Sequence, residues 1–315
     1  MDLRQWHNKG ASFIVFTYSE NDWLFYKRNM STAFTTARNL GLSVWVDPWG
    51  IEGIFSGETP SWFLLYHPDT WQVRADGTRV PHACPNAPSS LKFLRTWIDT
   101  VAEAGAEWIL WDEPHWYVPG VSYWQSKDEP SSLTCYCHHC QGKFHSQFHR
   151  SMPSQEDEDM ALFRHDSMLA LLTQVTEYAA IKGLKNAVCW APPEQLTTGL
   201  SLEDIITLKS TDELAIDPYW LMTGKDLDEH FSPIVRHAVE LCKNAGKPLQ
   251  VWLQGFGVPN GREPEILKAA EISAHLNIKD TAIWYHHGMS TLLPDDPHQL
   301  DGVLDELFAR FGGKF

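Results

Sequence analysis

Two adjacent carboxylates, Asp112 and Glu113, end an apolar run in the segment "EWILWDEPHW". Neighbouring carboxylates repel each other, so one of the pair tends to keep its proton at neutral pH. A protonated carboxyl group is the general acid that glycoside hydrolysis needs. We therefore expect Glu113 to be the acid, with Asp112 orienting it or contacting the sugar. The alternative is that one of the two carboxylates only caps the loop that follows.

Hydrolysis of a glycoside also needs a second carboxylate, as nucleophile or as the base that activates water. Four acidic residues end or follow other apolar runs: Asp217, Asp47, Glu194 and Glu20. We favour Asp217 for this role, followed by Asp47.

Aromatic and amide side chains accompany these carboxylates at the ends of the runs. Aromatic faces stack on sugar rings, and amides hydrogen-bond to sugar hydroxyl groups. The expected substrate contacts are Asp47, Trp49, Trp116, Tyr219, Trp220, Gln254, Trp284 and Glu20. Core packing accounts for some of the 15 tryptophans, and helix capping for some of the carboxylates. A ring of such run ends nevertheless predicts a carbohydrate pocket.

Three cysteines, Cys135, Cys137 and Cys140, form a C-x-C-x-x-C pattern in "TCYCHHC". Disulfides within so tight a triplet would be strained, whereas thiolates at this spacing favour zinc with four tetrahedral ligands. Cys84 is the expected fourth ligand, because it lies on the long loop 51–88, whereas the three other cysteines lie on the long loop 114–159. Four sulfurs leave no open position, so the predicted zinc is structural. The histidines that could replace a cysteine are His138, His139, His145 and His149.

These residues require a scaffold that brings distant run ends together. Seven runs rich in Val, Ile, Phe and Trp are typical of buried parallel strands: 12–18, 42–47, 107–113, 187–192, 213–220, 249–256 and 281–288. Helical patterns lie between them, at 23–39, 89–104, 160–182, 228–245, 263–276 and 297–311.

This alternation predicts an α/β fold, a closed (β/α)8 TIM barrel, with its eighth strand near 50–57. An open doubly wound sheet is the alternative, although no Gly-rich phosphate loop follows the first run. We expect one catalytic domain over residues 1–315, with long loops 51–88 and 114–159 on the catalytic face. The segment 114–159 is the expected zinc-binding insertion.

The overall charge narrows the choice of partners. A formal net charge of −15 disfavours nucleic acids and anionic membranes, which need clustered Lys and Arg. No apolar run approaches the length of a membrane span, and no apolar leader opens the chain. We therefore expect a cytoplasmic protein that binds a carbohydrate substrate. The zinc loop offers a contact for a homo-oligomer.

A resemblance to a known family emerges from residues 83–148. The segments "ACPNAPSSLKFLRTWI" and "CYCHHCQGKFHSQF", with Asp-Glu-Pro between them, resemble the barrel of glycoside hydrolase family 42 β-galactosidases. The resemblance implies a (β/α)8 barrel in which Glu113 is the acid/base. It also implies a structural zinc held by Cys84, Cys135, Cys137 and Cys140.

The sequence departs from that family in two places. Asp112 stands where the family has Asn, and Gln254 stands where the family has its nucleophilic Glu. A neutral glutamine cannot form the covalent glycosyl intermediate in the usual way. One expected mechanism therefore pairs Glu113 with Asp217 or another carboxylate.

Three alternatives remain open. The pair Asp112 and Glu113 resembles that of family 20 hexosaminidases, in which Asp orients the substrate's acetamido group as the nucleophile. Loss of the family's nucleophile would also fit an inactive sugar-binding barrel. The third alternative is a zinc-dependent hydrolase that uses "CHHC" together with His286 and His287.

Overall fold

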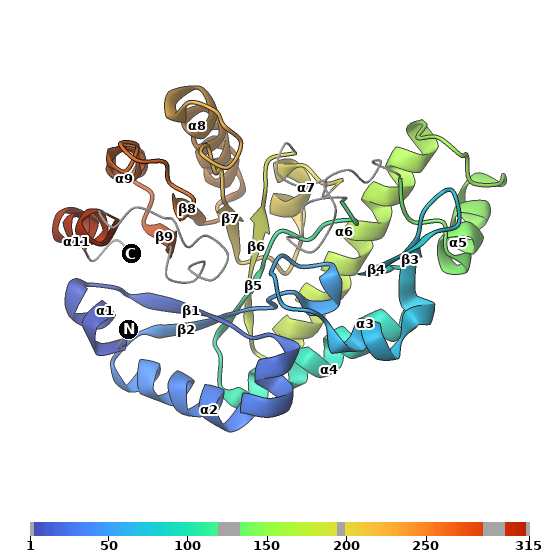
Figure 1. Ribbon diagram of the computed structural model, residues 1–315, viewed down its shortest axis with the longest axis horizontal. Coiled ribbons are helices and arrows are strands. Elements are labelled where there is room, and N and C mark those ends of the chain that lie inside the picture. Colours follow the sequence, from blue (N-terminus) through green and yellow to red (C-terminus); the bar gives the residue numbers. More distant parts are fainter. Residues whose placement is uncertain (1–2, 119–132, 194–198, 286–299, 313–315) are drawn as a thin grey trace.

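The computed structural model describes residues 3–118, 133–193, 199–285 and 300–312 (Figure 1). Seven parallel strands pair in chain order into one curled sheet, and they confirm all seven predicted strands. The strands are β1 (Phe13–Thr17), β2 (Ser43–Asp47), β5 (Trp108–Trp111), β6 (Lys185–Trp190), β7 (Glu213–Ile216), β8 (Leu249–Gly255) and β9 (Asp280–Tyr285).

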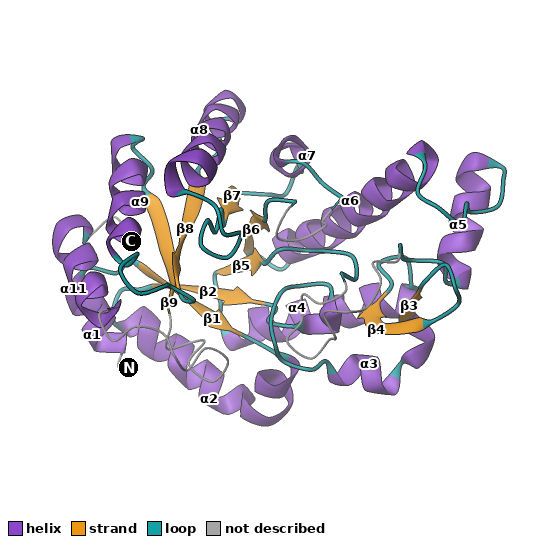
Figure 2. Cartoon of the chain, turned by 45° about the horizontal axis from the view of Figure 1, so that its top comes forward, coloured by secondary structure: helices purple, strands orange, loops and turns teal. Residues whose placement is uncertain are grey.

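A helix follows each strand of this sheet and lies on its outer side (Figures 1 and 2). These helices are α2 (Glu20–Asn39), α4 (Pro88–Ala104), α6 (Glu158–Ile181), α7 (Leu202–Thr207), α8 (Leu227–Ala245), α9 (Pro264–His275) and α11 (Leu300–Phe311). The short α1 (Leu3–Lys9) precedes β1. The strand order never reverses, as it would in a doubly wound sheet. The α/β barrel fold is therefore confirmed.

The predicted eighth strand in 50–57 is wrong. That segment holds a short 3-10 helix, Ile51–Gly53. Gly50 and Glu52 have φ angles of 67° and 58°, which are left-handed and cannot belong to an extended strand. A Cβ on Gly50 would lie 2.4 Å from the Thr59 carbonyl oxygen, so the close packing of this loop requires glycine.

Both long loops carry secondary structure that the sequence reading missed. The loop after β2 contains α3 (Trp62–Tyr66), a 3-10 turn (Pro68–Thr70) and an antiparallel hairpin of β3 (Trp71–Val73) and β4 (Arg79–Ala83). The loop after β5 contains α5 (His138–Phe148). The three-residue β3 and the five-residue α3 are too short to give a clear periodic pattern. The longer α5 buries only Cys140 and Phe144, so its apolar stripe is too weak to mark a helix.

Side chains alternate across the sheet and build two apolar layers. In β2, Val44 and Val46 face outward into the layer beneath the helices, which also contains Trp97 of α4. Trp45 faces inward and stacks on Trp108, with ring centroids 4.3 Å apart. The barrel interior is therefore packed with side chains, which leaves the strand ends to hold a site.

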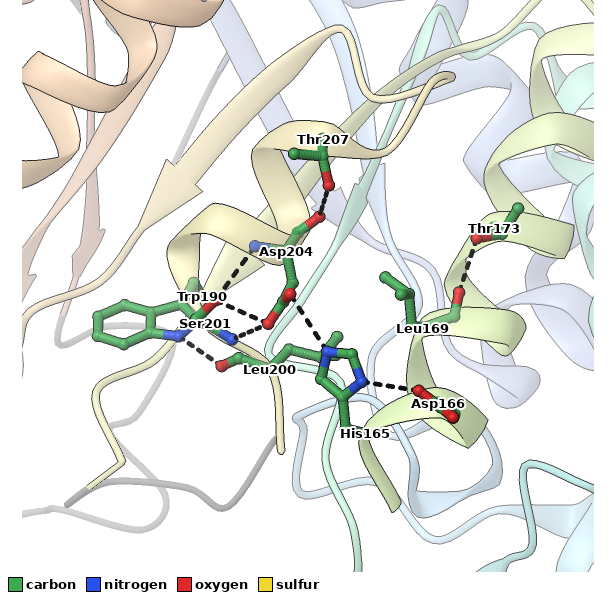
Figure 3. A network of polar contacts seen from close by, with 9 residues as sticks. All are labelled: His165, Asp166, Leu169, Thr173, Trp190, Leu200, Ser201, Asp204 and Thr207. Carbon is green, nitrogen blue, oxygen red and sulfur yellow. Dashed lines mark hydrogen bonds and ion pairs between the residues drawn. The ribbon is translucent and has the colours of Figure 1, made fainter. Parts of the chain in front are cut away.

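Hydrogen bonds and an ion pair join the start of α7 to α6 and to the end of β6 (Figure 3). The Trp190 indole donates to the Leu200 carbonyl at 3.1 Å. Ser201 and Asp204 then form a capping box that begins α7. His165 of α6 completes the network with a contact of 3.2 Å to the Asp204 carboxylate. These contacts fix the start of α7 against α6 and against the end of β6.

No helix in the described parts of the chain is long and apolar enough to cross a membrane.

Candidate active site

A pocket of about 500 Å³ lies at the C-terminal ends of the strands. This is the face where barrels carry their chemistry. Five acidic residues line it: Asp47, Glu58, Asp112, Glu113 and Asp217. The described lining contains no Lys or Arg. The pocket is therefore acidic.

Asp112 and Glu113 both reach the pocket because the backbone turns sharply after β5. In a regular strand, successive side chains point to opposite faces. Glu113 has a φ of 39°, in the left-handed region that non-glycine residues rarely adopt, and this breaks the alternation. The Ser56 hydroxyl donates to the Glu113 carboxylate at 2.5 Å. The Ser56 N–H donates to the Asp112 carbonyl at 3.2 Å, so the loop after β2 supports this turn.

Two buried histidines support the same turn from below. A nitrogen of His115 lies 2.7 Å from the Glu113 carbonyl oxygen, and a nitrogen of His82 lies 3.0 Å from the His115 carbonyl oxygen. Burial, followed by the nearby His115, lowers the pKa of His82 to about 3. His82 is therefore neutral at ordinary pH and acts as a hydrogen-bonding group rather than as a cation.

Asp217 ends β7 and supplies the second carboxylate at the floor of the pocket. It is 3% exposed, and its carboxyl group lies within hydrogen-bonding reach of Glu113. Burial raises the pKa of Asp217, and the negative charges of Glu113 and Asp112 raise it further. Asp217 also meets Asp112 and Cys189, with one ligand atom of each within 4.8 Å of the others.

Asp47 and Glu58 add negative charge beside this pair. Burial raises the pKa of Asp47, and the carboxylates of Asp112, Glu113 and Glu58 raise it further. Burial likewise raises the pKa of Glu58, with a contribution from Glu113. Such mutual repulsion keeps protons in the pocket at pH values where isolated carboxylates have lost them.

Aromatic side chains form the walls around these acids. Trp49, which follows β2, stacks on Trp284 of β9 with centroids 4.9 Å apart and an interplanar angle of 25°. Tyr219 meets Phe256 edge to face at 5.3 Å, and Trp252 lines the same pocket. Flat apolar faces beside hydrogen-bonding carboxylates are what a sugar ring requires.

Four predicted substrate contacts lie away from the pocket. The carboxylate of Glu20 accepts the Ser61 hydroxyl and, at 2.7 Å, the Phe63 N–H. Glu20 therefore anchors the loop after β2. Trp116 is fully buried, with the Arg164 guanidinium 5.0 Å from its ring centroid.

Trp220 and Gln254 are also structural. The Trp220 indole donates to the Glu265 carboxylate at 2.7 Å. The side-chain oxygen of Gln254 accepts the N–H groups of Leu221 and Met222, at 3.1 and 3.2 Å. Gln254 thus fixes the loop that follows β7. The remaining sequence candidates Glu194, His286 and His287 lie outside the described residues.

The structure adds pocket residues that the sequence reading did not select. They are Ser56, Glu58, His82, His115, Tyr117, Trp252 and Phe256. Most lie in the two long loops, where no periodic pattern marks the direction of a side chain. The sequence indicates these residues only through the position of their loops, which follow strands and therefore lie at the C-terminal face of the barrel.

The four cysteines Cys84, Cys135, Cys137 and Cys140 meet in a buried cluster apart from the pocket. Their sulfurs lie within 4.8 Å of one another, and none forms a disulfide. Cys84 follows the hairpin strand β4, whereas Cys137 and Cys140 begin α5. None of the described histidines belongs to this group.

Hydrogen bonds and nearby positive charges surround these sulfurs. The Asn86 backbone donates to Cys84 at 3.4 Å, and the Asn86 side chain donates to Cys140 at 3.3 Å. The Lys143 ammonium donates to the Asn86 amide oxygen at 2.7 Å. Arg164 also lies in the electrostatic neighbourhood of Cys135 and Cys140. Burial, followed by hydrogen bonds to the other cysteines, raises the pKa of Cys84, whereas hydrogen bonds from Cys135 and Cys140 lower the pKa of Cys137.

No protein-family model matches the chain. No curated protein matches it either.

Solved structures do match the fold. The catalytic domain of β-amylase from Paenibacillus polymyxa aligns over 98% of this chain and 93% of its own, with a TM-score of 0.66 and 12% identity. The glycoside hydrolase domain of PgaB (BpsB) from Bordetella bronchiseptica aligns over 97% and 91%, with a TM-score of 0.61 and 12% identity.

A β-galactosidase from the psychrophilic Marinomonas ef1 aligns over 90% of this chain and 52% of its own, with a TM-score of 0.59 and 10% identity. At these identities the likeness establishes the fold alone. The resemblance to family 42 stays a prediction. The chain therefore shares the barrel fold of these structures and has an acidic and aromatic pocket at the C-terminal ends of its strands.

Proposed function

We propose that this protein is a glycoside hydrolase acting on an oligosaccharide or glycoside, with Glu113 as acid/base and Asp217 as nucleophile. One observation carries the proposal. The carboxyl groups of Glu113 and Asp217 lie within hydrogen-bonding reach at the floor of a pocket walled by tryptophans. Glycoside hydrolysis needs two such carboxyl groups in one site, one as acid and one as nucleophile.

The proposed mechanism is retaining, because Asp217 acts as a nucleophile and not as the base for a water. Inverting glycosidases hold their carboxyls about 6.5–9.5 Å apart to make room for a water, whereas retaining enzymes hold them about 5–5.5 Å apart.

Burial and the neighbouring charges raise the pKa of Asp217 in the free pocket, so the reaction requires the proton to lie on Glu113 and Asp217 to be ionised when the substrate is bound. In the first step, Glu113 then protonates the glycosidic oxygen while Asp217 attacks the anomeric carbon. The bond to the leaving group breaks, and a glycosyl ester forms on Asp217. In the second step, Glu113 takes a proton from water, which attacks the same carbon and releases Asp217. Ser56 and His115 position Glu113 through the contacts described above.

A substrate-assisted mechanism on an N-acetylated sugar is the second candidate. The observation that favours it is that Asp112 lines the pocket beside Glu113. Asp112 would then orient an acetamido group whose oxygen attacks the anomeric carbon. In the inactive-barrel alternative Gln254 marks a lost nucleophile, and Gln254 is here engaged with the backbone of a neighbouring loop, outside the described pocket lining.

The experiment that tests the proposal uses 4-nitrophenyl glycosides of both anomers, and of gluco, galacto and 2-acetamido configuration. Turnover is followed by release of nitrophenol. A 2-deoxy-2-fluoro glycoside of the preferred sugar then traps the enzyme, and peptide mass spectrometry locates the label. We expect a label on Asp217. Turnover without any labelled carboxylate, limited to N-acetylated substrates, would establish the substrate-assisted route instead.

We also propose a structural zinc held by Cys84, Cys135, Cys137 and Cys140. In a tetrahedral site with Zn–S distances of about 2.3 Å, neighbouring sulfurs lie about 3.8 Å apart. The Cys84 sulfur lies 3.3 Å from that of Cys140 and 3.4 Å from that of Cys137, so a small expansion would admit the ion. Zinc there would join the hairpin, which carries His82, to α5.

A further inference from the structure

The pocket holds more negative charge than glycoside hydrolysis uses. Two carboxylates suffice for the reaction proposed above. Five acidic residues line the pocket, and the described lining has no Lys or Arg to balance them. Asp47, Glu58 and Asp112 are therefore left without a role in the two-carboxylate mechanism.

Two carboxylate oxygens in this group have no partner. Asp47 is 2% exposed, and its Oδ1 makes no hydrogen bond. Asp217 is 3% exposed, and its Oδ1 is likewise without a partner. Buried polar atoms are nearly always hydrogen-bonded, so unpaired acceptors in a pocket point to donors on the bound molecule.

A positively charged donor would match this site better than a neutral hydroxyl group. Each of these carboxylates lies in the field of the others, and burial strengthens that repulsion. A cation placed among them removes the repulsion and supplies hydrogen bonds. A primary ammonium group has three donors and no acceptor, so it can satisfy several carboxylates at once.

Resting on the glycosidase function proposed above, we propose that the substrate is an amino sugar whose free amine binds as an ammonium group beside Asp47. An N-acetylated sugar would bring a neutral amide to the same oxygens. A plain hexose would bring a hydroxyl group. The site therefore discriminates among three sugars that differ in one substituent.

Binding is measured by calorimetry on the Glu113→Gln variant, so that the result does not depend on turnover. The probes are glucosamine, glucose and N-acetylglucosamine, with the corresponding galacto set, at a pH where the amine is protonated. We expect the amine to bind at least 10-fold more tightly than either neutral partner. The further change Asp47→Asn should reduce that preference several-fold. Asp69→Asn, an exposed site in the same inserted segment, should leave it unchanged.

Several results would overturn the inference. They include equal affinities for the three sugars, a preference for the N-acetylated sugar, or a preference that survives Asp47→Asn with the fold intact by circular dichroism. A divalent cation is the other charge that fits, so MnCl2 and ZnCl2 are titrated separately. A divalent ion that binds in the pocket, excludes glucosamine and is lost in Asp217→Asn would replace the amine as ligand.

The two proposals fail in different ways. Hydrolysis of neutral glycosides without any amine preference would overturn the amino-sugar inference and leave the glycosidase function standing. A clear amine preference without hydrolysis of any glycoside by the unaltered protein would overturn the glycosidase function, and the cation-binding pocket would stand.

Discussion

The carboxyl groups of Glu113 and Asp217 lie within hydrogen-bonding reach of each other, although β6 separates their two strands in the sheet. The sulfur of Cys189, on β6, lies within 4.8 Å of a carboxylate oxygen of Asp112 and of Asp217. A flat sheet would hold alternate strands about 10 Å apart. Curling of the sheet and the sharp turn at Glu113 bring the two side chains together over the small Cys189.

Replacing Glu113 tests the role of this pair. Glu113→Gln keeps the shape and removes the transferable proton, so kcat should fall about 10²–10⁴-fold with the melting temperature nearly unchanged. Steady-state kinetics on the best aryl glycoside measures the loss. Glu240→Gln, an exposed change on α8, is the matched control and should retain full activity. Wild-type turnover in Glu113→Gln would remove Glu113 from the mechanism.

Ser56 is expected to position Glu113. Its hydroxyl donates to the Glu113 carboxylate at 2.5 Å, and hydrogen bonds to charged groups contribute about 1.5–3 kcal/mol. Ser56→Ala should therefore lower kcat about 10-fold or more and change KM much less. Ser56→Thr retains a hydroxyl group and should recover part of the rate. Equal rates for the Ala and Thr variants would argue against this hydrogen bond.

The cysteine cluster gives a prediction about metal content. The unaltered protein should carry about one zinc per chain by elemental analysis, and Cys137→Ser should lose it. The melting temperature should then fall by roughly 5 °C or more, because a structural metal contributes folding energy directly. Cys242→Ser, a buried thiol in α8 outside the cluster, should keep the zinc. Zinc loss in both variants, or in neither, would contradict this assignment.

Glu52 predicts how stability changes with pH. Burial raises its pKa to about 8, although the Ser90 hydroxyl donates to its carboxylate and opposes the shift. In the unfolded chain its pKa is about 4.3. Between these values the unfolded state releases a proton that the folded state keeps, so stability is lost as pH rises through this window.

Glu52→Gln removes that pH dependence. We expect its melting temperature to exceed that of the unaltered protein by more at pH 8 than at pH 5. Differential scanning calorimetry at the two pH values measures the difference, with exposed Glu240→Gln as the control. A difference that is the same at both pH values would show that Glu52 ionises in the folded protein as it does in the unfolded chain.

Sequence patterning predicted the scaffold well because most of the strands, β2 and β5 to β8, are buried on both sides, while β1 and β9 are half-buried but equally rich in apolar residues. Continuous apolar runs marked all seven, and the acid or aromatic residue at each end marked the catalytic face. Asp47, Trp49, Asp112, Glu113, Asp217, Tyr219 and Trp284 all line the pocket. A residue at or just beyond the end of a strand lies at the barrel mouth for geometrical reasons, which is why these residues lie together.

The position of a residue at the end of a strand does not show whether its side chain already forms hydrogen bonds within the protein. Trp220 and Glu20 satisfy that criterion, yet both make hydrogen bonds to neighbouring segments. Those partners lie in inserted or later segments whose packing depends on the whole fold. The prediction of an eighth strand at 50–57 was wrong for a local reason, because Gly50 and Glu52 have left-handed backbone conformations that interrupt an extended strand.

Gln254 is one of the two residues at which the sequence departs from the family it resembles, and its contacts predict the effect of replacing it with the family's Glu. Its oxygen accepts two backbone N–H groups, and its nitrogen donates to the Phe256 carbonyl at 3.1 Å. Gln254→Glu would keep both accepted bonds and set a carboxylate oxygen against that carbonyl. Because Gln254 is only 1% exposed, water cannot replace the lost donor, and the substitution should destabilise the fold by about 1–3 kcal/mol.

The same change should not raise activity, because Gln254 is not part of the described pocket lining. Urea denaturation measures the stability change, and the aryl glycoside assay measures turnover in the same preparation. Gln254→Met, of similar length and without polar atoms, should destabilise more, because it leaves the N–H groups of Leu221 and Met222 unpaired. A gain in hydrolysis on Gln254→Glu would instead return the nucleophile to the end of β8 and displace Asp217 from that role.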